Sequence, residues 1–469
     1  MKGVNSLQRT EEGKPQVALV TLGDSRREFY QQRIAIVEEE MQKAKTALEK
    51  CFTVYQSPIV YSDAEAEAVA RQIRGRGIGA VVIHLPIWGT PALALRIAQS
   101  TERPVAVLAN KRKDSSSLVV MLAVAGMLDQ CAKPCVRIAG EVNEPETFRQ
   151  LEQYVRACAL VEAVRASEYC MVGGRSIGIG TTVARWARVF GTSFDHADQL
   201  EVCLRAEKID AQRVARHLDW WKKQVKIEFG GRFTPESLDR QMRSYLALRD
   251  MAAERGYDFL GLKCQQEMSD HYALQCLAVA LLNNDCDADG PKVPIPTSCE
   301  CDCDGALTMR ILSLACGGAP SCLVDIKFFG EENHGFTLAN CGAMAPYFAD
   351  PAGGSYKRVT MMAHTFGLAG GGATQMIAAP GPVTVARLFR TNGTYVLGCF
   401  EGRTVMKPIE ELRKTTWCYP HQFIEAEVDY DLFLRTMNSN HLHSVYGKYA
   451  GLLRQFCEMT GIRFINYNK

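Results

Sequence analysis

Two acidic residues and one histidine in the C-terminal half of the chain could together bind a metal ion. Glu300 ends the stretch Val293–Glu300 (VPIPTSCE), and Asp325 follows the apolar run 322–324 (CLV). Each carboxylate therefore follows strand-like sequence that would deliver it to a cleft. Two carboxylates held close together repel unless they share a proton or a cation. A hard divalent ion that also binds His441 would satisfy both, and would suit chemistry on neighbouring hydroxyl or carbonyl oxygens.

Local sequence alone leaves other roles open for the histidine. A single histidine is more often a surface or core residue than a ligand. His334 and His364 lie in the same half of the chain as His441 and remain alternatives. The pair of imidazoles at His441 and His443, preceded by Asn440, makes this position the best local candidate for a metal ligand.

The run Cys299–Asp304 (CECDCD) alternates three cysteines with three acids. Alternation at period two would place the cysteines on one face of a strand and the acids on the other. No second cysteine or histidine pair follows at zinc-finger spacing, so we expect the cysteines to be small buried packing residues. Asp302 and Asp304 could equally form a solvated turn that leads into a helix at 306–314.

Composition and charge favour a soluble globular protein of the cytoplasm. Apolar residues make up 47% of the chain and charged residues 23%, and the net charge of +2 gives no reason to expect a nucleic-acid partner. The polar N-terminus lacks the apolar core of a secretory signal, and no run approaches the ~20 apolar residues of a membrane helix. Eighteen cysteines without such a signal predict reduced thiols.

A glycine-rich stretch, Gly173–Gly180 (GGRSIGIG), raises the possibility of a dinucleotide site. Its spacing differs from the G-x-G-x-x-G of a pyrophosphate loop, and no helix clearly begins at it. A plain loop between a strand and a helix is the better interpretation. No G-x-x-x-x-G-K-[ST] phosphate loop occurs in the sequence, so we expect no nucleotide cofactor.

Alternating strand and helix patterns predict two doubly wound parallel-sheet domains of the α/β class. In the first, 1–165, buried strands are expected at 16–24, 80–85 and 104–108, with helices at about 27–48 and from Ser62, which begins a capping box. In the second, 166–320, strands at 169–173 and 259–263 flank amphipathic helices over 206–254, and a helical stretch follows at 270–282.

The last part of the chain, 321–469, predicts a β-rich domain. Strands at 383–389 and 395–400 flank Asn392-Gly393, the strongest short hairpin signal in the chain. A helix is expected near Tyr446–Thr460. Because the second domain ends close to Asp325, we expect the two carboxylates near a seam between domains, where small ligands usually bind.

With these residues assembled, the chain resembles the L-fucose isomerase/L-arabinose isomerase family, closer to the fucose branch, as a shorter member. The similarity consists of short motifs in a shared order and spacing. They are Gly261–Asp270 (GLKCQQEMSD), Ala278–Asn284 (AVALLNN), Cys299–Ala306 (CECDCDGA), Leu323–Ile326 (LVDI), Leu338–Gly342 (LANCG), Gly370–Gly372, the hairpin Pro380–Gly402 and Asn440–His441. They cover about the C-terminal half.

The resemblance implies a metal-dependent aldose–ketose isomerase, usually a homohexamer, with Mn²⁺ as its cofactor. The family's glutamate, aspartate and histidine ligands correspond to Glu300, Asp325 and His441, and the two carboxylates also correspond to its catalytic acid and base. Residues expected to contact the sugar are Gln265, Trp88, Trp417, Asn440 and Arg26, with Trp88 and Arg26 supplied by a neighbouring subunit. The substrate would be a monosaccharide, isomerised through a cis-enediol, with no nucleic-acid or membrane partner.

Two other functions remain open. An isomerase of an anionic hexose, 6-sulfonated or phosphorylated, is one, because arginines at 26, 27 and 387 could meet an anion. The other is a non-catalytic sugar-binding or regulatory protein that keeps the fold, although the acidic pair would then have no evident purpose.

Overall fold

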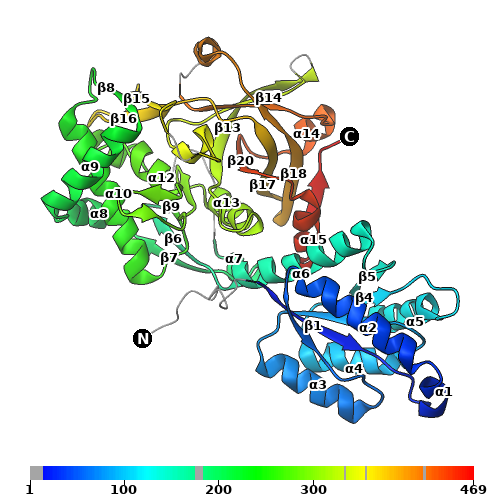
Figure 1. The fold of residues 1–469 in the computed structure, drawn as a ribbon. Coiled ribbons are helices and arrows are strands. Elements are labelled where there is room, and N and C mark those ends of the chain that lie inside the picture. Colours follow the sequence, from blue (N-terminus) through cyan, green and yellow to red (C-terminus); the bar gives the residue numbers. More distant parts are fainter. Residues whose placement is uncertain (1–13, 175–182, 332–333, 354–355, 416–418) are drawn as a thin grey trace. The chain divides into compact units, whose positions relative to one another are not determined.

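The computed structural model describes residues 14–174, 183–331, 334–353, 356–415 and 419–469. It divides the chain into two compact units, Met1–Ala163 and Val164–Lys469. The further boundary expected near residue 320 stays a prediction, because both sides of it lie within the second unit. The two units are described separately (Figure 1).

The first unit is a five-stranded parallel sheet with strand order β2-β1-β3-β4-β5. Its elements are β1 (Gln16–Thr21), α1 (Arg27–Gln31), α2 (Ile34–Glu49), β2 (Thr53–Gln56), α3 (Asp63–Gly75), β3 (Ala80–Leu85), α4 (Pro91–Thr101), β4 (Val105–Ala109), α5 (Ser117–Gln130), β5 (Cys135–Ala139) and α6 (Pro145–Arg165). Side chains of α3, α4 and α5 form one hydrophobic cluster with β1, β3 and β4. Because β3 and β4 are buried along their whole length, they read as continuous apolar runs. The predicted α/β pattern is confirmed here.

The second unit begins with a four-stranded parallel sheet, order β12-β9-β6-β7. Its strands are β6 (Glu168–Val172), β7 (Ser193–Ala197), β9 (Phe259–Leu262) and β12 (Thr297–Cys299). The helices around it are α7 (Trp186–Val189), α8 (Gln199–Glu207), α9 (Ala211–Gln224), α10 (Pro235–Arg255), α11 (Glu267–His271), α12 (Cys276–Leu282) and α13 (Cys303–Ala315). This block confirms the second parallel sheet that the alternating pattern predicted.

The β-rich part of this unit is a mixed sheet that closes on itself. The strands are β13 (Cys322–Gly330), β14 (Gly335–Ala339), β17 (Gly381–Thr391), β18 (Thr394–Val405), β19 (His421–Glu425), β20 (His441–Tyr446) and β21 (Arg463–Asn466), in the order β17-β20-β13-β14-β19-β18-β21. Pairing of β17 with β18 closes the ring, and the predicted turn at Asn392-Gly393 joins them, both residues having positive φ. Closure leaves fewer free strand edges in this part of the chain.

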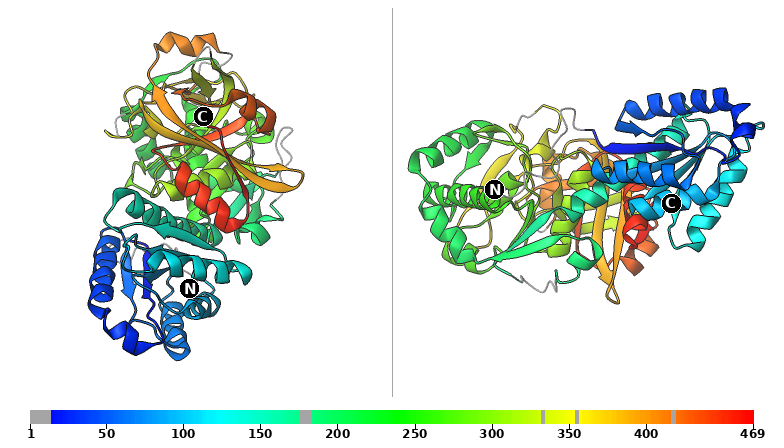
Figure 2. Two further views of the ribbon diagram at one scale, coloured as in Figure 1. Left: turned by 90° about the vertical axis from the view of Figure 1, so that its right-hand side faces the viewer. Right: turned by 90° about the horizontal axis from the view of Figure 1, so that it is seen from below.

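Shorter elements complete the unit. β8 (Lys226–Glu228), β15 (Thr360–Ala363) and β16 (Gly372–Gln375) form a small sheet, β10 (Cys286–Asp287) and β11 (Gly290–Pro291) form a hairpin, and α14 (Tyr430–Thr436) precedes β20. The final helix, α15 (Ala450–Thr460), contacts β18 and β21 (Figure 2). It begins four residues later than the expected Tyr446, because Tyr446 completes β20.

One hydrophobic core runs through the second unit from its helices to the closed sheet. The cluster includes Leu246 of α10, Leu277 of α12, Val324 of β13 and Phe400 of β18. α13 contacts β9 on one side and β17 and β20 on the other (Figure 1). The ends of the parallel strands are therefore held in a fixed position against the closed sheet.

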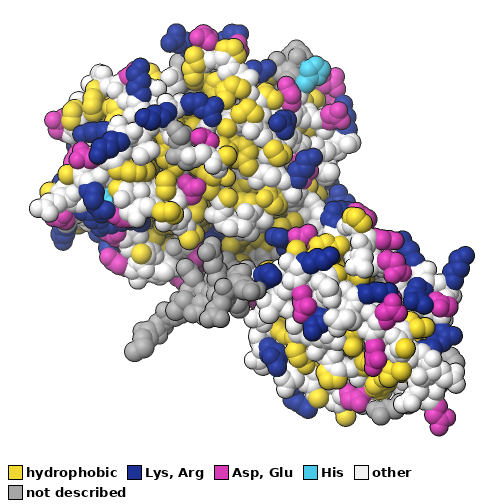
Figure 3. All heavy atoms as spheres, viewed as in Figure 1, with side chains coloured by type: hydrophobic (Ala, Val, Ile, Leu, Met, Phe, Trp, Pro, Cys, Tyr) yellow, Lys and Arg dark blue, Asp and Glu magenta, His cyan; other side chains and the backbone are white. Residues whose placement is uncertain are grey.

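On the face shown in Figure 3, basic and acidic side chains are interspersed, without a large patch of one sign. Among the helices that the structure describes, none is both long and apolar enough to cross a membrane.

Gly261→Ala is expected to destabilise the second unit by about 1–3 kcal/mol, because overpacking forces its neighbours apart. A Cβ at Gly261 of β9 would lie 2.1 Å from the Tyr169 hydroxyl oxygen and 3.2 Å from Cys301 Sγ. The free energy of unfolding from urea denaturation measures this loss. Gly126→Ala in α5 is the control, since its Cβ meets no atom within 4 Å, and it should be neutral or slightly stabilising. Equal stability of the two variants would contradict the prediction.

Candidate active site

Asp325 and His441 face each other across two antiparallel strands of the closed sheet. They are direct partners in the register of β13 and β20. His441 Nε2 lies 3.5 Å from Asp325 Oδ1 and 3.8 Å from Glu300 Oε2. Glu300 arrives from a different layer, directly after parallel strand β12. The structure therefore brings together three side chains that are distant in sequence.

The backbone at Glu300 turns sharply before α13. Glu300 and Cys301 have φ values of 57° and 52°, in the left-handed region that residues other than glycine rarely adopt. The expected strand-like alternation over Cys299–Asp304 is therefore wrong, because β12 ends at Cys299 and α13 begins at Cys303. The expectation that the three cysteines are buried is confirmed.

Asp302 is the residue whose role the sequence did not reveal. It is fully buried and accepts four hydrogen bonds: from His441 Nδ1 at 2.8 Å, from two nitrogens of Arg387 at 2.5 and 3.0 Å, and from the Gly305 backbone N–H at 3.0 Å. The solvated turn considered for Asp302 and Asp304 is wrong, since both are buried and Asp304 pairs with Arg390. The only local signal was the N-cap position of Asp302 before an apolar helix.

Burial dominates the electrostatics of the two carboxylates near His441. It raises the pKa of Glu300 to about 7, against the opposing charge of His441, and neighbouring acids including Asp325 add to the rise. Burial likewise raises the pKa of Asp325. At neutral pH, Glu300 is therefore poised to take up or release a proton.

Asp302 behaves in the opposite way. Burial works against its ionisation, but the charge of Arg387 and the hydrogen bonds from His441 and Arg387 hold its pKa well below the usual value. An ionised carboxylate can only accept hydrogen bonds, so His441 must donate from Nδ1. The Nε2 atom of a neutral His441 then presents a lone pair toward Glu300 and Asp325.

The donor set fits a divalent cation. Two carboxylates and an imidazole whose other nitrogen is held by a carboxylate are a common way to bind metals that accept both oxygen and nitrogen ligands. Bonds of roughly 2.0–2.2 Å require ligand atoms within about 4.4 Å of one another. Each carboxylate meets this distance to His441, but the three do not form a group whose ligand atoms all lie within 4.8 Å. The two carboxylates would have to move toward each other to share an ion.

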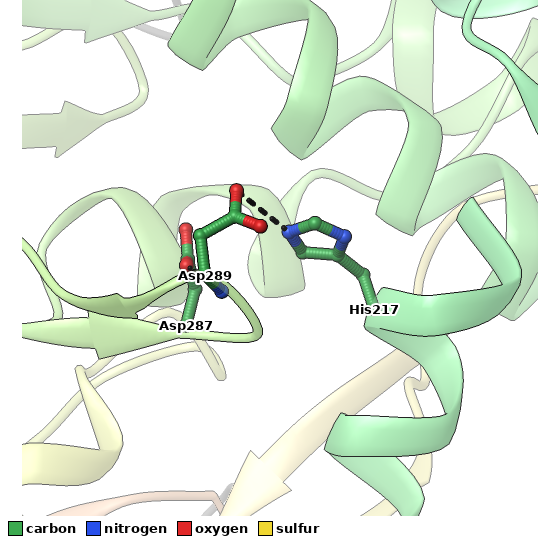
Figure 4. Close-up of side chains that lie close together, drawn as sticks. All are labelled: His217, Asp287 and Asp289. Carbon is green, nitrogen blue, oxygen red and sulfur yellow. Dashed lines mark hydrogen bonds and ion pairs between the residues drawn. The ribbon is translucent and has the colours of Figure 1, made fainter. Parts of the chain in front are cut away.

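A different cluster does meet that spacing among the described residues: His217 of α9 with Asp287 and Asp289 of the β10–β11 hairpin (Figure 4). Arg249 contacts both carboxylates, at 2.5 and 2.8 Å, and Arg216 contacts Asp289 at 2.5 Å. Two guanidinium groups thus balance two carboxylates without a metal. These ion pairs hold the hairpin against α9 and α10.

Of the other residues expected to contact the sugar, one is bonded to a residue of the site and the others lie elsewhere or outside the described residues. Asn440 donates a hydrogen bond from Nδ2 to Asp325 Oδ1 at 3.2 Å, which places it at the site. Gln265 is partly buried in the turn between β9 and α11. Trp88 packs against the core of the first unit, and Arg26 of the same unit pairs with Asp24. Trp417 lies outside the described residues, as does most of the glycine-rich stretch 173–180.

The structure also gives the positions of the two alternative histidines and of Arg387, the alternative anion ligand. His364 Nε2 lies 2.8 Å from the carbonyl oxygen of Cys341, and His334 is exposed near the start of β14. Arg387, considered as a ligand for an anionic sugar, is 7% exposed and forms an ion pair with Asp302. It therefore cannot serve as a free anion ligand.

Comparison with protein families supplies the second line of evidence. Residues 14–166 match the model of the L-fucose isomerase first N-terminal domain, and residues 338–468 match that of the L-fucose isomerase C-terminal domain. The two matches cover more than half of the chain and lie in both units. They favour an enzyme over a non-catalytic sugar-binding protein.

Other comparisons add little. We find no significant match among curated proteins. Of the solved structures, a periplasmic solute-binding protein from Actinobacillus succinogenes 130z with bound D-allose is 10% identical, covering 58% of this chain and 82% of its own, at a TM-score of 0.17. A solute-binding protein from Conexibacter woesei DSM 14684 is 14% identical, covering 66% and 75%, at 0.16. Overlaps this low carry no argument about this chain.

The raised pKa of Glu300 predicts a pH-dependent effect of Glu300→Gln on stability in metal-free buffer. Between pH 4.5 and about 7 the folded protein keeps a proton that the unfolded chain has lost, so wild-type stability falls as pH rises through this window. The variant lacks this loss. Its unfolding free energy relative to wild type should therefore increase by about 1–3 kcal/mol from pH 5 to pH 8.

Urea denaturation at several pH values measures the difference. Glu410→Gln, at an exposed position, is the matched control and should show no such trend. An offset between Glu300→Gln and wild type that is the same at every pH would contradict the assignment.

Proposed function

The chain belongs to the L-fucose isomerase family and is a sugar isomerase, and we propose that it interconverts an aldose and a ketose with a divalent metal, Mn²⁺, bound by Glu300, Asp325 and His441. The observation that carries the proposal is the convergence of both carboxylates on His441 Nε2, at 3.8 and 3.5 Å, from separate layers of the second unit. Neither strand pairing nor core packing requires charged side chains there.

Moving a carbonyl between C1 and C2 requires removing a proton from one carbon and returning it to the next, through a cis-enediol. Bound Mn²⁺ would stabilise the negative charge that develops on the two sugar oxygens. Glu300 and Asp325, both close to His441 Nε2, would act as base and acid in turn. Proton transfer by a positioned group typically contributes about 10² to 10⁴ in rate.

The remaining proposals concern what surrounds this centre. Asn440, which binds Asp325, and Gln265 would contact the sugar hydroxyls. Trp88 and Arg26 belong to the first unit, and we propose that a neighbouring subunit of a homohexamer supplies them. Trp417 would pack against the apolar face of the sugar.

An anionic hexose is a second candidate substrate, and a cavity lined by Lys327, two residues after Asp325 on β13, favours it. Lys327 is close enough to Asp325 for its pKa to respond to that charge, although burial is the larger influence and lowers that pKa. It lines a cavity of about 760 Å³ together with Lys407 and Lys414. Glu411 and Glu425 also line it and offset part of the positive charge. A 6-phosphorylated or 6-sulfonated hexose could place its anion there.

Glu300→Gln should abolish ketose formation, with a loss of at least ~10²-fold, because the amide can neither carry the proton nor bind the metal as a carboxylate. Turnover of a panel of neutral, 6-phosphorylated and 6-sulfonated aldoses measures it and also identifies the substrate class. Circular dichroism checks that the variant is folded, and Glu410→Gln should keep full activity. Turnover by Glu300→Gln at the wild-type rate would refute the role.

Removal of metal should stop catalysis without unfolding the protein. After dialysis against EDTA, activity on the preferred aldose should fall to background, and added Mn²⁺ should restore it, since the carboxylates and His441 would otherwise lack the ion that stabilises the enediol oxygens. Full activity in protein shown by elemental analysis to contain no divalent metal would contradict the proposal.

A further inference from the structure

We infer that Asp302 and Arg387 are positioning residues, which hold His441 with its proton on Nδ1 and its Nε2 directed at Glu300 and Asp325. The inference deepens the proposed function and rests on the metal role of His441. Both side chains are buried, so we expect neither to touch the sugar or the reacting atoms. They would act through the imidazole.

The hydrogen bonds of Asp302 fix one geometry of the imidazole. Its Oδ2 lies 2.8 Å from His441 Nδ1, and its Oδ1 accepts from the Gly305 backbone N–H at 3.0 Å. The second bond ties the carboxylate to the first turn of α13, whose N-cap is Asp302 itself. The imidazole is therefore oriented by a rigid helix end and not by a mobile side chain.

Arg387 holds the same carboxylate from the neighbouring strand β17. It bonds both oxygens of Asp302, at 2.5 and 3.0 Å, and extends from β17, which pairs with the strand that carries His441. Two parallel N–H···O bonds fix the plane of a carboxylate as well as its position. The two side chains are 7% and 0% exposed, so water does not compete for these bonds.

A neighbouring ion pair on the same two elements offers a matched control. Asp304 of α13 binds Arg390 of β17, at 2.8 Å, in side chains that are 6% and 17% exposed. Its carboxylate also accepts from Trp186 Nε1 at 3.4 Å. Asp304 and Asp302 are thus both buried at the start of α13, and both pair with an arginine of β17. Only Asp302 is also bonded to His441.

The test compares two charge-neutral double variants, Asp302→Asn/Arg387→Gln and Asp304→Asn/Arg390→Gln. Both remove one buried pair, so both should lower the melting temperature. Only the first should weaken Mn²⁺ binding, by about 10- to 100-fold in Kd by isothermal titration calorimetry; the second should stay within about threefold of wild type. Unchanged Mn²⁺ affinity in the first variant, or an equal loss in both, would overturn the inference.

A second measurement needs no metal and is read from the wild-type protein. In protein labelled with ¹⁵N-histidine and free of metal, the His441 ring, identified by its loss in His441→Gln, should show a hydrogen-bonded proton on Nδ1. A proton on Nε2 alone would overturn the inference even if Mn²⁺ binds. If wild type shows the Nδ1 proton but binds no Mn²⁺, the proposed function fails while the positioning of His441 by Asp302 stands.

Discussion

The register of β13 against β20 is the constraint on which the site depends. Asp325 and His441 point to the same face because they are direct partners in this antiparallel pair. A slip of one residue would turn one of them to the opposite face and separate the two side chains. Pairing of β20 with β17, and of β17 with β18, closes the ring and limits such a slip. The precision of the site therefore comes from the closed sheet more than from the loops around it.

A buried ion pair is a weak source of stability, because removing two charges from water offsets most of their attraction. The pair of Asp302 and Arg387 lies in the interior, and its four hydrogen bonds to the carboxylate reduce this cost without making it a gain. Exposed pairs such as Lys226 with Glu228 contribute about 0–1 kcal/mol. Apolar residues would fill the same space at lower cost. The orientation of His441 is what an apolar pair could not supply.

Much of the fold could be predicted from local patterns. Continuous apolar runs predicted β1, β3 and β4 of the first parallel sheet and β6 and β9 of the second, and Asn392-Gly393 predicted the hairpin of β17 and β18. These signals are local, because they arise from the period of burial and from backbone preferences at single positions. The closure of the β-rich sheet could not be predicted in this way, since it depends on pairings between strands far apart in the chain.

The residues of the site also divide into those that local sequence reveals and those that only long-range contacts reveal. Glu300, Asp325 and His441 were found from their residue types and from the resemblance, but the contact of Asp302 with Arg387 spans 85 residues and that with His441 spans 139. Nothing near Arg387 distinguished it from a surface arginine. Period-two alternation also misled, because it assumed that the backbone stays extended after Cys299. A left-handed turn at Glu300 and Cys301 leaves no local pattern when neither residue is glycine.

That left-handed turn is itself evidence about the site. A left-handed conformation costs roughly 1–2 kcal/mol for each residue other than glycine, and such strain persists only where the surroundings impose it. Here the Cys301 backbone N–H donates to the Leu262 carbonyl at 3.1 Å, and the Thr297 N–H donates to Asn283 Oδ1 at 2.8 Å, so both β12 and the turn are anchored. If the backbone stayed extended after Cys299, it would prolong β12 and could not turn into α13. The turn instead brings the Glu300 carboxylate to 3.8 Å from His441 Nε2, and a glycine at this position would relieve the strain only by removing that carboxylate.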